Sequence, residues 1–287
     1  MLDFDLYFFR ASERLGISPK VALRLIRARR IAADFPRWRR NQREVAKIRT
    51  RSAFSRLIKR QEGYSVFEPG TLPNVSPTLL EGAIAQAAQL ADARGDMVAK
   101  SKKPFFANVM TAEDFDRCDK IIELANHPTM MDIAAGYLGT SFKLRSVGVY
   151  VSEKNYSLYS SQLFHYDMND LHQLKCFINV NMVTAENGPL TFVPADVSEA
   201  AGLSWGTGQF TDETVFASVP RPALIELVGP PGTGAFVDTS RCLHFGSRTK
   251  TERRVVIMIQ YTPDPDVSLK SGKKQGKKGV PVLIGED

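Results

Sequence analysis

Cysteine, histidine and tryptophan are scarce in this sequence of 287 residues, which contains 3, 4 and 2 of them respectively. Cys118, Cys176 and Cys242 are widely spaced, so neither a disulfide framework nor a zinc knuckle is predicted, and we expect reduced, buried thiols. No stretch approaches the roughly 20 apolar residues that a membrane span requires. The first residues are acidic where a secretory signal would be basic. These absences favour a soluble, cytoplasmic protein.

Positive charge is concentrated near the N-terminus. Residues 1–62 hold 17 Lys and Arg against 6 Asp and Glu, whereas the rest of the chain is mildly acidic. This segment is predicted to form helices over 20–30, with Ser18 as the cap and Pro19 in the first turn, and over 38–57. Three interpretations stay open: an extension that packs on the core or a second subunit, a nucleic-acid or membrane patch, and a site for an acidic partner such as a carrier protein.

Three segments are expected along the chain: a basic helical extension (1–62), a β domain with preceding helices (63–265) and a basic flexible tail (266–287). A loop is predicted over 63–76, helices over 77–93, 111–125 and from 128 to 136 or 139, and a short strand over 104–109. Turn-separated β runs follow, with strands expected at 141–152, 161–167, 173–181, 189–193, 213–217, 222–228, 234–238, 241–245 and 254–261. The fold class is therefore mainly β, with a jelly-roll (double-stranded β-helix, cupin-like) core flanked by helices.

His165 and Asp167 are separated by one residue in a predicted strand, so both side chains point to the same face. Chance alone gives about 0.4 His-x-acid pairs in this composition, so the pair needs support from its context. His244 could arrive from a neighbouring strand. Two imidazoles and one carboxylate form the facial triad that holds non-haem Fe(II). His127, before a helical proline, and His172, in a loop, are not expected to be ligands.

A cation stands at the start of the apolar run 254–261. Burying an unpaired charge is expensive, so a guanidinium that enters a β core requires an anion, and a carboxylate matches it in bidentate geometry. Arg254 and Arg253 point to opposite faces of the strand, and either could fill this role. Arg248 could close over the mouth of the site. Cys242 could share a face with His244, in which case its oxidation would harm the site.

Four stretches carry a family resemblance: Gln162 to Met168, 174–194 with its Asn187-Gly188-Pro189 turn, 242–248 and 253–261. In this order they resemble the phytanoyl-CoA dioxygenase family over roughly residues 140–262. The resemblance implies a jelly roll, Fe(II) and 2-oxoglutarate. It implies that His165, Asp167 and His244 are the metal ligands. One departure is that Pro194-Ala-Asp-Val197 stands where the family often has Pro-Gly-Ser-His.

The same resemblance suggests a co-substrate pocket. The spacing from His244 favours Arg254 over Arg253 as the residue that binds the distal carboxylate of 2-oxoglutarate. Phe177 aligns with an aromatic position that lines this pocket in related enzymes. Lys175 shares the face of Phe177 and could add a charge, although an outward-facing lysine is nearly as plausible.

The predicted function is that of an Fe(II)/2-oxoglutarate-dependent dioxygenase, which uses O2 to hydroxylate an unactivated C–H bond and converts 2-oxoglutarate to succinate. Because Asp167 is present, hydroxylation is favoured over the halogenation of related enzymes in which a small residue replaces the carboxylate. The alternatives are a cupin-like metal-binding protein without oxygenase activity and a scaffold for the basic N-terminal segment. The small-molecule substrate and the oligomeric state are not readable from the sequence.

Overall fold

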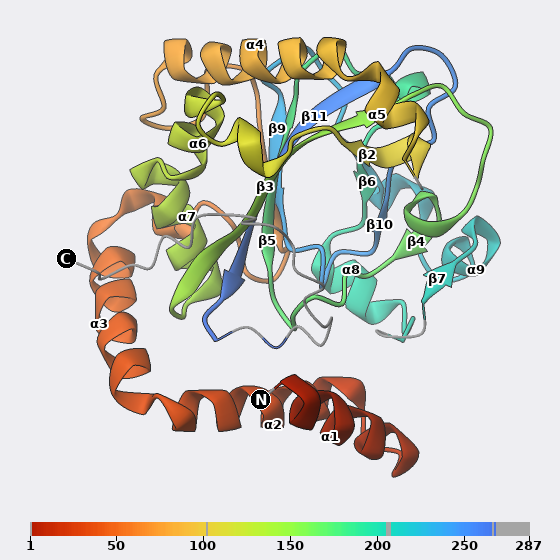
Figure 1. Ribbon diagram of the computed structural model, residues 1–287. Helices are drawn as coiled ribbons and strands as arrows, with labels where there is room; N and C mark the ends of the chain where they lie inside the picture. Colours follow the sequence, from red (N-terminus) through yellow and green to blue (C-terminus); the bar gives the residue numbers. More distant parts are fainter. Residues whose placement is uncertain (1, 102, 205–207, 266, 268–287) are drawn as a thin grey trace.

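Two antiparallel β-sheets lie at the centre of the protein, and helices cover one face of the larger sheet (Figure 1). The structure, a computed structural model, describes residues 2–101, 103–204, 208–265 and 267. The predicted basic tail therefore falls almost wholly outside the described residues. The described chain has more residues in α-helices than in strands, whereas a mainly β protein was expected. Several strands contain only two residues, which keeps the β content low.

The larger sheet has six strands in the order β1-β9-β5-β11-β3-β2, and the smaller has five in the order β7-β4-β10-β6-β8. All neighbouring strands in both sheets pair antiparallel. The larger sheet comprises β1 (Tyr64–Phe67), β2 (Ala107–Asn108), β3 (Phe142–Ser152), β5 (Leu174–Asn179), β9 (Gly234–Val237) and β11 (Arg254–Pro263). The smaller comprises β4 (Phe164–His165), β6 (Thr191–Phe192), β7 (Gln209–Phe210), β8 (Ile225–Glu226) and β10 (His244–Phe245).

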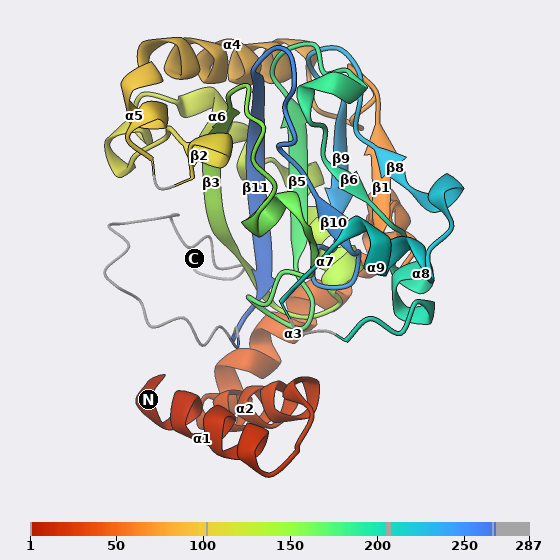
Figure 2. The same ribbon diagram turned by 90° about the vertical axis from the view of Figure 1, so that its right-hand side faces the viewer.

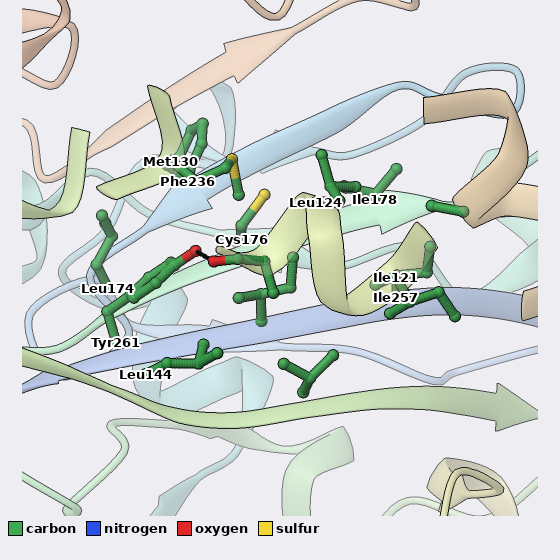
Figure 3. Close-up of a cluster of buried hydrophobic side chains, with 14 of the residues drawn as sticks. Ile121, Leu124, Met130, Leu144, Leu174, Cys176, Ile178, Phe236, Ile257 and Tyr261 are labelled. Carbon is green, nitrogen blue, oxygen red and sulfur yellow. Dashed lines mark hydrogen bonds between the residues drawn. The ribbon is translucent and has the colours of Figure 1, made fainter. Parts of the chain in front are cut away.

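The outer face of the larger sheet is covered by α4 (Pro77–Ala93), α6 (Asp119–Ala125) and α7 (Pro128–Leu138). The start of α4 is determined by local sequence: Ser76 accepts a hydrogen bond from the backbone N–H of Leu79, and Pro77 occupies the first turn. Figure 3 shows the resulting core, in which Ile121 and Leu124 of α6 lie against Ile178 of β5 and Ile257 of β11. The predicted helix over 77–93 is confirmed.

Side-chain alternation along β11 separates this core from a second one. Val255, Ile257 and Ile259 point outward to the helices, whereas Val256 and Met258 point inward to a cluster with Phe192 of the smaller sheet. The inner cluster thus contains side chains from both sheets. The site described below lies on this inner side.

The N-terminal helices α1 (Leu2–Arg14) and α2 (Pro19–Ala33) lie together at one end of the molecule, and α3 (Phe35–Arg51) connects them to the rest (Figures 1 and 2). Several of their arginines are paired internally, since Arg29 and Arg30 both bind the buried Asp5. Arg27 forms an ion pair with Asp170, a fully buried carboxylate of the β domain. No helix in the described part of the chain combines the length and apolarity needed to cross a membrane.

The remaining short helices are α5 (Gly95–Ala99), α8 (Ala195–Ala200) and α9 (Asp212–Phe216), with 3-10 turns η1 (Ala53–Arg56), η2 (Pro104–Phe106), η3 (Ala112–Asp114), η4 (Ser160–Gln162), η5 (Ala185–Asn187) and η6 (Arg221–Ala223). The departure from the family pattern at 194–197 therefore coincides with the start of α8. The expected helix over 38–57 ends earlier, at Arg51, and the expected helix over 111–125 is split into η3 and α6.

Several strand predictions and one loop prediction were wrong in type or extent. The strands expected over 104–109, 189–193, 222–228 and 241–245 are reduced to the two residues each of β2, β6, β8 and β10. Residues 213–217 form α9 rather than a strand, because Thr211 caps the N-H of Thr214 and two acidic residues occupy the first turn. The predicted strand over 161–167 is reduced to β4, since η4 occupies its first residues. The predicted loop over 63–76 contains β1, whose partner β9 lies far along the chain and left no local signal.

The buried carboxylate of Asp114 links Arg94, at the end of α4, to Thr111, and its contribution to the stability of the fold can be measured. It is 2% exposed, accepts two hydrogen bonds from Arg94, each at 2.6 Å, and also binds Thr111. Burial raises the pKa of Asp114, but these hydrogen bonds outweigh burial and bring the pKa below its ordinary value. We expect Asp114→Asn to lower the free energy of unfolding by about 2–3 kcal/mol at pH 7 in a urea titration.

The pH dependence of this loss has a defined sign. A carboxyl with a depressed folded-state pKa contributes stability above its unfolded-state pKa, near 3.9, and this contribution is lost as the pH falls further. The difference between the parent and Asp114→Asn should therefore shrink below about pH 4. The exposed Asp116 is the matched control, and Asp116→Asn should have little effect. Equal losses in both variants would contradict the assignment.

Candidate metal centre

Two histidines face each other across neighbouring strands of the smaller sheet. His165 of β4 and His244 of β10 are direct partners in the antiparallel register, and their ring centroids are 4.3 Å apart. Asp167 follows two residues after His165. One ligand atom from each of the three side chains lies within 4.8 Å of the others. Residues 79 positions apart in the sequence thus meet because of strand pairing.

Each imidazole is fixed in one orientation by its own backbone. The Nδ1 of His165 lies 2.9 Å from the carbonyl oxygen of Leu163, and the Nδ1 of His244 lies 3.0 Å from that of Cys242. A carbonyl can only accept, so Nδ1 carries the proton in both rings and Nε2 keeps its lone pair. The Nε2 of His244 lies 3.7 Å from Oδ2 of Asp167. In known metal sites, hydrogen bonds from Nδ1 to carbonyl oxygens orient the histidine ligands in this way.

Electrostatics keep the three side chains in the protonation states that a cation requires. Burial lowers the pKa of His244 to about 3, assisted by neighbouring His165, and burial also lowers the pKa of His165. Burial would raise the pKa of Asp167, but the charge and hydrogen bond of the Lys175 ammonium at 2.6 Å, together with the neighbouring imidazoles, outweigh burial, so the pKa lies below its ordinary range. At neutral pH the cluster therefore offers two neutral imidazoles and a carboxylate.

A cavity of about 350 Å³ opens beside these three residues. Its walls come from both sheets: Phe177 of β5, Met258 of β11, Leu190, which precedes β6, and Phe245 of β10. Lys175 also lines it, with its side chain only 10% exposed. The sequence had left open whether Lys175 points inward, and its ion pair with Asp167 shows that it does.

Arg254 lies in the same cavity without an acidic partner. It is 3% exposed, and its Nη2 lies 3.4 Å from Oγ of Ser247, while its Nε has no hydrogen-bond partner. Burial lowers the pKa of Arg254 to about 10, which leaves it charged at neutral pH. No carboxylate in the described part of the chain pairs with it. Such a charge is costly unless an anion joins it.

Two serines near Arg254 were not identified from the sequence. Ser152 stands opposite Arg254 in the register of β3 with β11, and its Oγ donates to Oγ of Ser247 at 2.9 Å. Ser247 has a positive φ of 64°, which is rare for serine and is associated with functional sites. Only the pairing of β3 with β11 places Ser152 beside Arg254, and a single sequence does not reveal which strands pair.

The Asn187-Gly188-Pro189 turn supports this end of the cavity. Gly188 has a φ of 69°, and a Cβ there would lie 2.6 Å from the backbone nitrogen of Arg248. Its carbonyl accepts a hydrogen bond from the N–H of Ser247 at 3.1 Å. Only glycine permits this close approach, so the turn holds the segment that carries Ser247.

The other candidates from the sequence lie elsewhere. Arg253 points away from the cavity and pairs with Asp92 of α4. Arg248 binds Asp212 of α9 through two hydrogen bonds, at 2.8 and 2.7 Å, and does not line the cavity. His172 lies 3.3 Å from the buried Asp238.

Two further side chains have structural positions. His127 caps α7. Gln162 is buried and binds Asn155 and the carbonyl of Ser247, so it supports the loop next to the cavity.

Comparison with solved structures relates this arrangement to known folds. A non-haem monooxygenase, ThoJ in its apo form, aligns with a TM-score of 0.52 and 15% sequence identity over 79% of this chain and 82% of its own. EctD from S. alaskensis, with 2-oxoglutarate and 5-hydroxyectoine, aligns with a TM-score of 0.51 and 17% identity over 72% of this chain and 74% of its own. At such low identity the similarity is one of fold. No family model and no curated protein matches the sequence.

Cys242, two residues before His244, does not line the cavity. The Sγ of Cys242 lies 3.7 Å from the carbonyl oxygens of Glu62 and Gly63, and the side chain is fully buried in the inner cluster. Burial raises the pKa of the Cys242 thiol well above its usual range, and it also raises those of Cys118 and Cys176. The thiolate is the reactive form.

We therefore expect no thiol of the native protein to react with Ellman's reagent within minutes at pH 7.5, and all three to react after unfolding. Cys242→Ser serves as the control and should leave two reactive thiols after unfolding. Rapid native reaction in the parent that is lost in Cys242→Ser would contradict the buried position and would revive the expectation that oxidation harms the site.

Proposed function

We propose that the protein is an Fe(II)/2-oxoglutarate-dependent dioxygenase that hydroxylates an unactivated C–H bond of a small organic substrate. The observation that carries this proposal is an uncompensated, buried guanidinium, Arg254, in the same cavity as a His-Asp-His cluster. A metal centre alone needs no such cation. A dicarboxylate that chelates the metal at one end and binds Arg254 at the other accounts for both.

His165, Asp167 and His244 would hold the metal ion. The set fits Fe(II), because two imidazoles and one carboxylate leave coordination positions open for other ligands. Because the Nδ1 protons are bound to carbonyl oxygens, both Nε2 lone pairs would be available to the metal. Lys175 holds Oδ2 of Asp167 and thereby limits the orientations of this carboxylate.

Arg254 would bind the distal carboxylate of 2-oxoglutarate, with Ser247 beside it. Phe177, Leu190 and Met258 form apolar walls of this part of the cavity, which exclude water and strengthen the interaction of the two charges. Lys175 lines the same cavity and adds a second cation near the co-substrate.

Fe(II) with bound 2-oxoglutarate supplies the oxidising chemistry: one oxygen atom of O2 enters the substrate C–H bond as a hydroxyl, the other enters succinate, and CO2 leaves. The chain contributes orientation and a dry cavity. Because the Asp167 carboxylate takes the position that a halide would need, hydroxylation is proposed over halogenation.

Three finer assignments belong to the same proposal. The two sheets would form a jelly roll, for which the fold similarity to ThoJ and EctD gives support. Membership of the phytanoyl-CoA dioxygenase family would follow from the order of the sequence motifs. An anionic partner for basic residues 1–62 has weaker support, since Arg27, Arg29 and Arg30 already have acidic partners within the chain.

Metal binding is tested by anaerobic titration with Fe(II) in the presence of 2-oxoglutarate, monitored by the visible charge-transfer band of the chelated complex. We expect a band with one equivalent of Fe(II) in the parent and none in His165→Ala, Asp167→Ala or His244→Ala, because each removes a ligand. His127→Ala and His172→Ala are the matched controls and should titrate like the parent. A band that survives all three ligand substitutions would refute the proposed centre.

The co-substrate site is tested with neighbouring arginines. Arg254→Met should raise the Kd of 2-oxoglutarate about 10- to 100-fold in the metal-loaded protein, which corresponds to the loss of a charge-assisted hydrogen bond of ~1.5–3 kcal/mol. Arg253→Met removes the same charge on the opposite face and should change the Kd less than about twofold. The reverse result would transfer the role to Arg253.

Oxygenase activity is separated from metal binding alone by succinate formation. The Fe(II)-loaded parent in air should convert 2-oxoglutarate to succinate and CO2, slowly without substrate and faster when a substrate binds. Isotope-labelled O2 should place one labelled oxygen atom in succinate. Tight Fe(II) and 2-oxoglutarate binding without any succinate would favour the alternative of a metal-binding protein.

A further inference from the structure

The cavity carries an excess of positive charge. Three cations line it, Lys103, Lys175 and Arg254, against a single carboxylate, Asp167. If the proposed function holds, the divalent metal ion and the 2-oxoglutarate dianion add no net charge. Two positive charges therefore remain uncompensated by the described lining residues in the loaded cavity.

Two of the three cations already have partners in that state. Arg254 would bind the distal carboxylate of 2-oxoglutarate, and Lys175 contacts Asp167 at 2.6 Å. Lys103 differs, because its ammonium has no acidic partner in the described part of the chain and donates to a neutral group, the hydroxyl of Ser160, at 2.7 Å. Lys103 is also exposed, so it stands at the mouth of the cavity.

From this charge distribution we propose that the substrate is an anion with an apolar body, whose carboxylate or phosphate group binds Lys103 at the mouth of the cavity. This inference rests on the proposed function and names the substrate class of the same site. A cationic substrate would meet unfavourable potential at the mouth and inside the cavity. A negatively charged one would be attracted before it binds.

The mouth is constructed from two distant segments that Lys103 and Ser160 join. The ring of Phe105 contacts that of Tyr159 edge to face, with centroids 4.8 Å apart, beside the Lys103–Ser160 hydrogen bond. Ser160 has a positive φ of 54°, so two of the three non-glycine residues with positive φ in the described chain, Ser160 and Ser247, line this cavity. Strained residues of this kind persist where surrounding contacts hold them.

Apolar surface follows directly inside Lys103. Phe106 lines the cavity and stacks on Tyr150, with ring centroids 4.5 Å apart, and Met168, which is 50% exposed, also lines it. Two acidic residues, Asp212 and Glu213, follow the lining segment 208–209, and neither lines the cavity. Asp212 is bound by Arg248 in bidentate geometry. An apolar body with an anionic end therefore matches the surface from the mouth to the metal centre.

The test compares four probes that share one aromatic body and differ at the end group: 3-phenylpropionate, 2-phenylethyl phosphate, 3-phenylpropan-1-ol and 3-phenylpropylamine. Their Kd values are measured by ligand-observed NMR with full-length protein loaded with Zn(II) and 2-oxoglutarate. We expect the two anions to bind at least about fivefold more tightly than the alcohol, and the amine to bind most weakly. The carboxylate and phosphate probes also show which anion Lys103 prefers. Equal or tighter binding of the alcohol or the amine would overturn the inference.

Substitutions then assign the preference to Lys103. Lys103→Met should reduce the affinity for both anions to about that for the alcohol, Lys103→Glu should reverse the order of anion and amine, and Lys103→Arg should restore the parental order. Lys47→Glu, on an exposed part of α3, makes the same charge change at a distance and should leave all four Kd values unchanged. An anion preference that survives Lys103→Glu would overturn the role of Lys103.

Replacing Zn(II) by Mn(II) locates the bound probes, because the paramagnetic ion should broaden the aromatic lines of the anions only if they bind near the metal centre. Absence of broadening would contradict binding in this cavity. The outcomes also separate the two proposals. If the parent fails to bind Zn(II) and 2-oxoglutarate, the proposed function fails. If it binds both and shows no anion preference, only the present inference fails.

Discussion

A guanidinium without an acidic partner, held inside the protein, is the constraint on which the interpretation of this structure depends. Three buried carboxylates have cationic partners within the chain: Asp5 has two arginines, Asp114 has Arg94, and Asp170 has Arg27. The buried Arg254, by contrast, lacks an acidic partner in the described chain. The folded protein therefore keeps an unpaired buried charge that an external anion can neutralise. In the proposed function, this interaction would contribute binding energy for a ligand that also chelates the metal.

Strand pairing determines where Arg254 and the three candidate metal ligands lie. The β4–β10 register sets His165 opposite His244, and the β3–β11 register sets Ser152 opposite Arg254. The two halves of the site thus belong to different sheets, which share the inner apolar cluster. Their separation is determined by packed side chains rather than by a flexible loop, which is the arrangement that precise chelation at both ends of one small molecule requires.

The sequence predicted what depends on local pattern and missed what depends on long-range pairing. Strand parity put Arg253 and Arg254 on opposite faces, and the spacing from His244 in the family resemblance favoured Arg254. The prediction of α4 followed from its cap and first-turn proline. By contrast, β1 was missed because it pairs with β9 across most of the chain. Lys103 and Ser160 were missed because nothing in either segment indicates that they meet. The residues 213–217 were misjudged because β-branched residues suggested a strand, whereas the Thr211 cap decided for a helix.

The link between Arg27 and Asp170 also changes how the basic N-terminal segment is to be regarded. Asp170 lies three residues beyond Asp167, has no exposed surface, and receives the backbone N–H of Val267 in addition to the guanidinium. Leu23 and Ile26 of the same helix pack against Val267. A chain shortened to residues 63–265 would lack both Arg27 and Val267, which bind the Asp170 carboxylate, on the loop that carries the proposed metal ligand Asp167. The N-terminal helices therefore help to hold that loop in place through the Arg27–Asp170 ion pair.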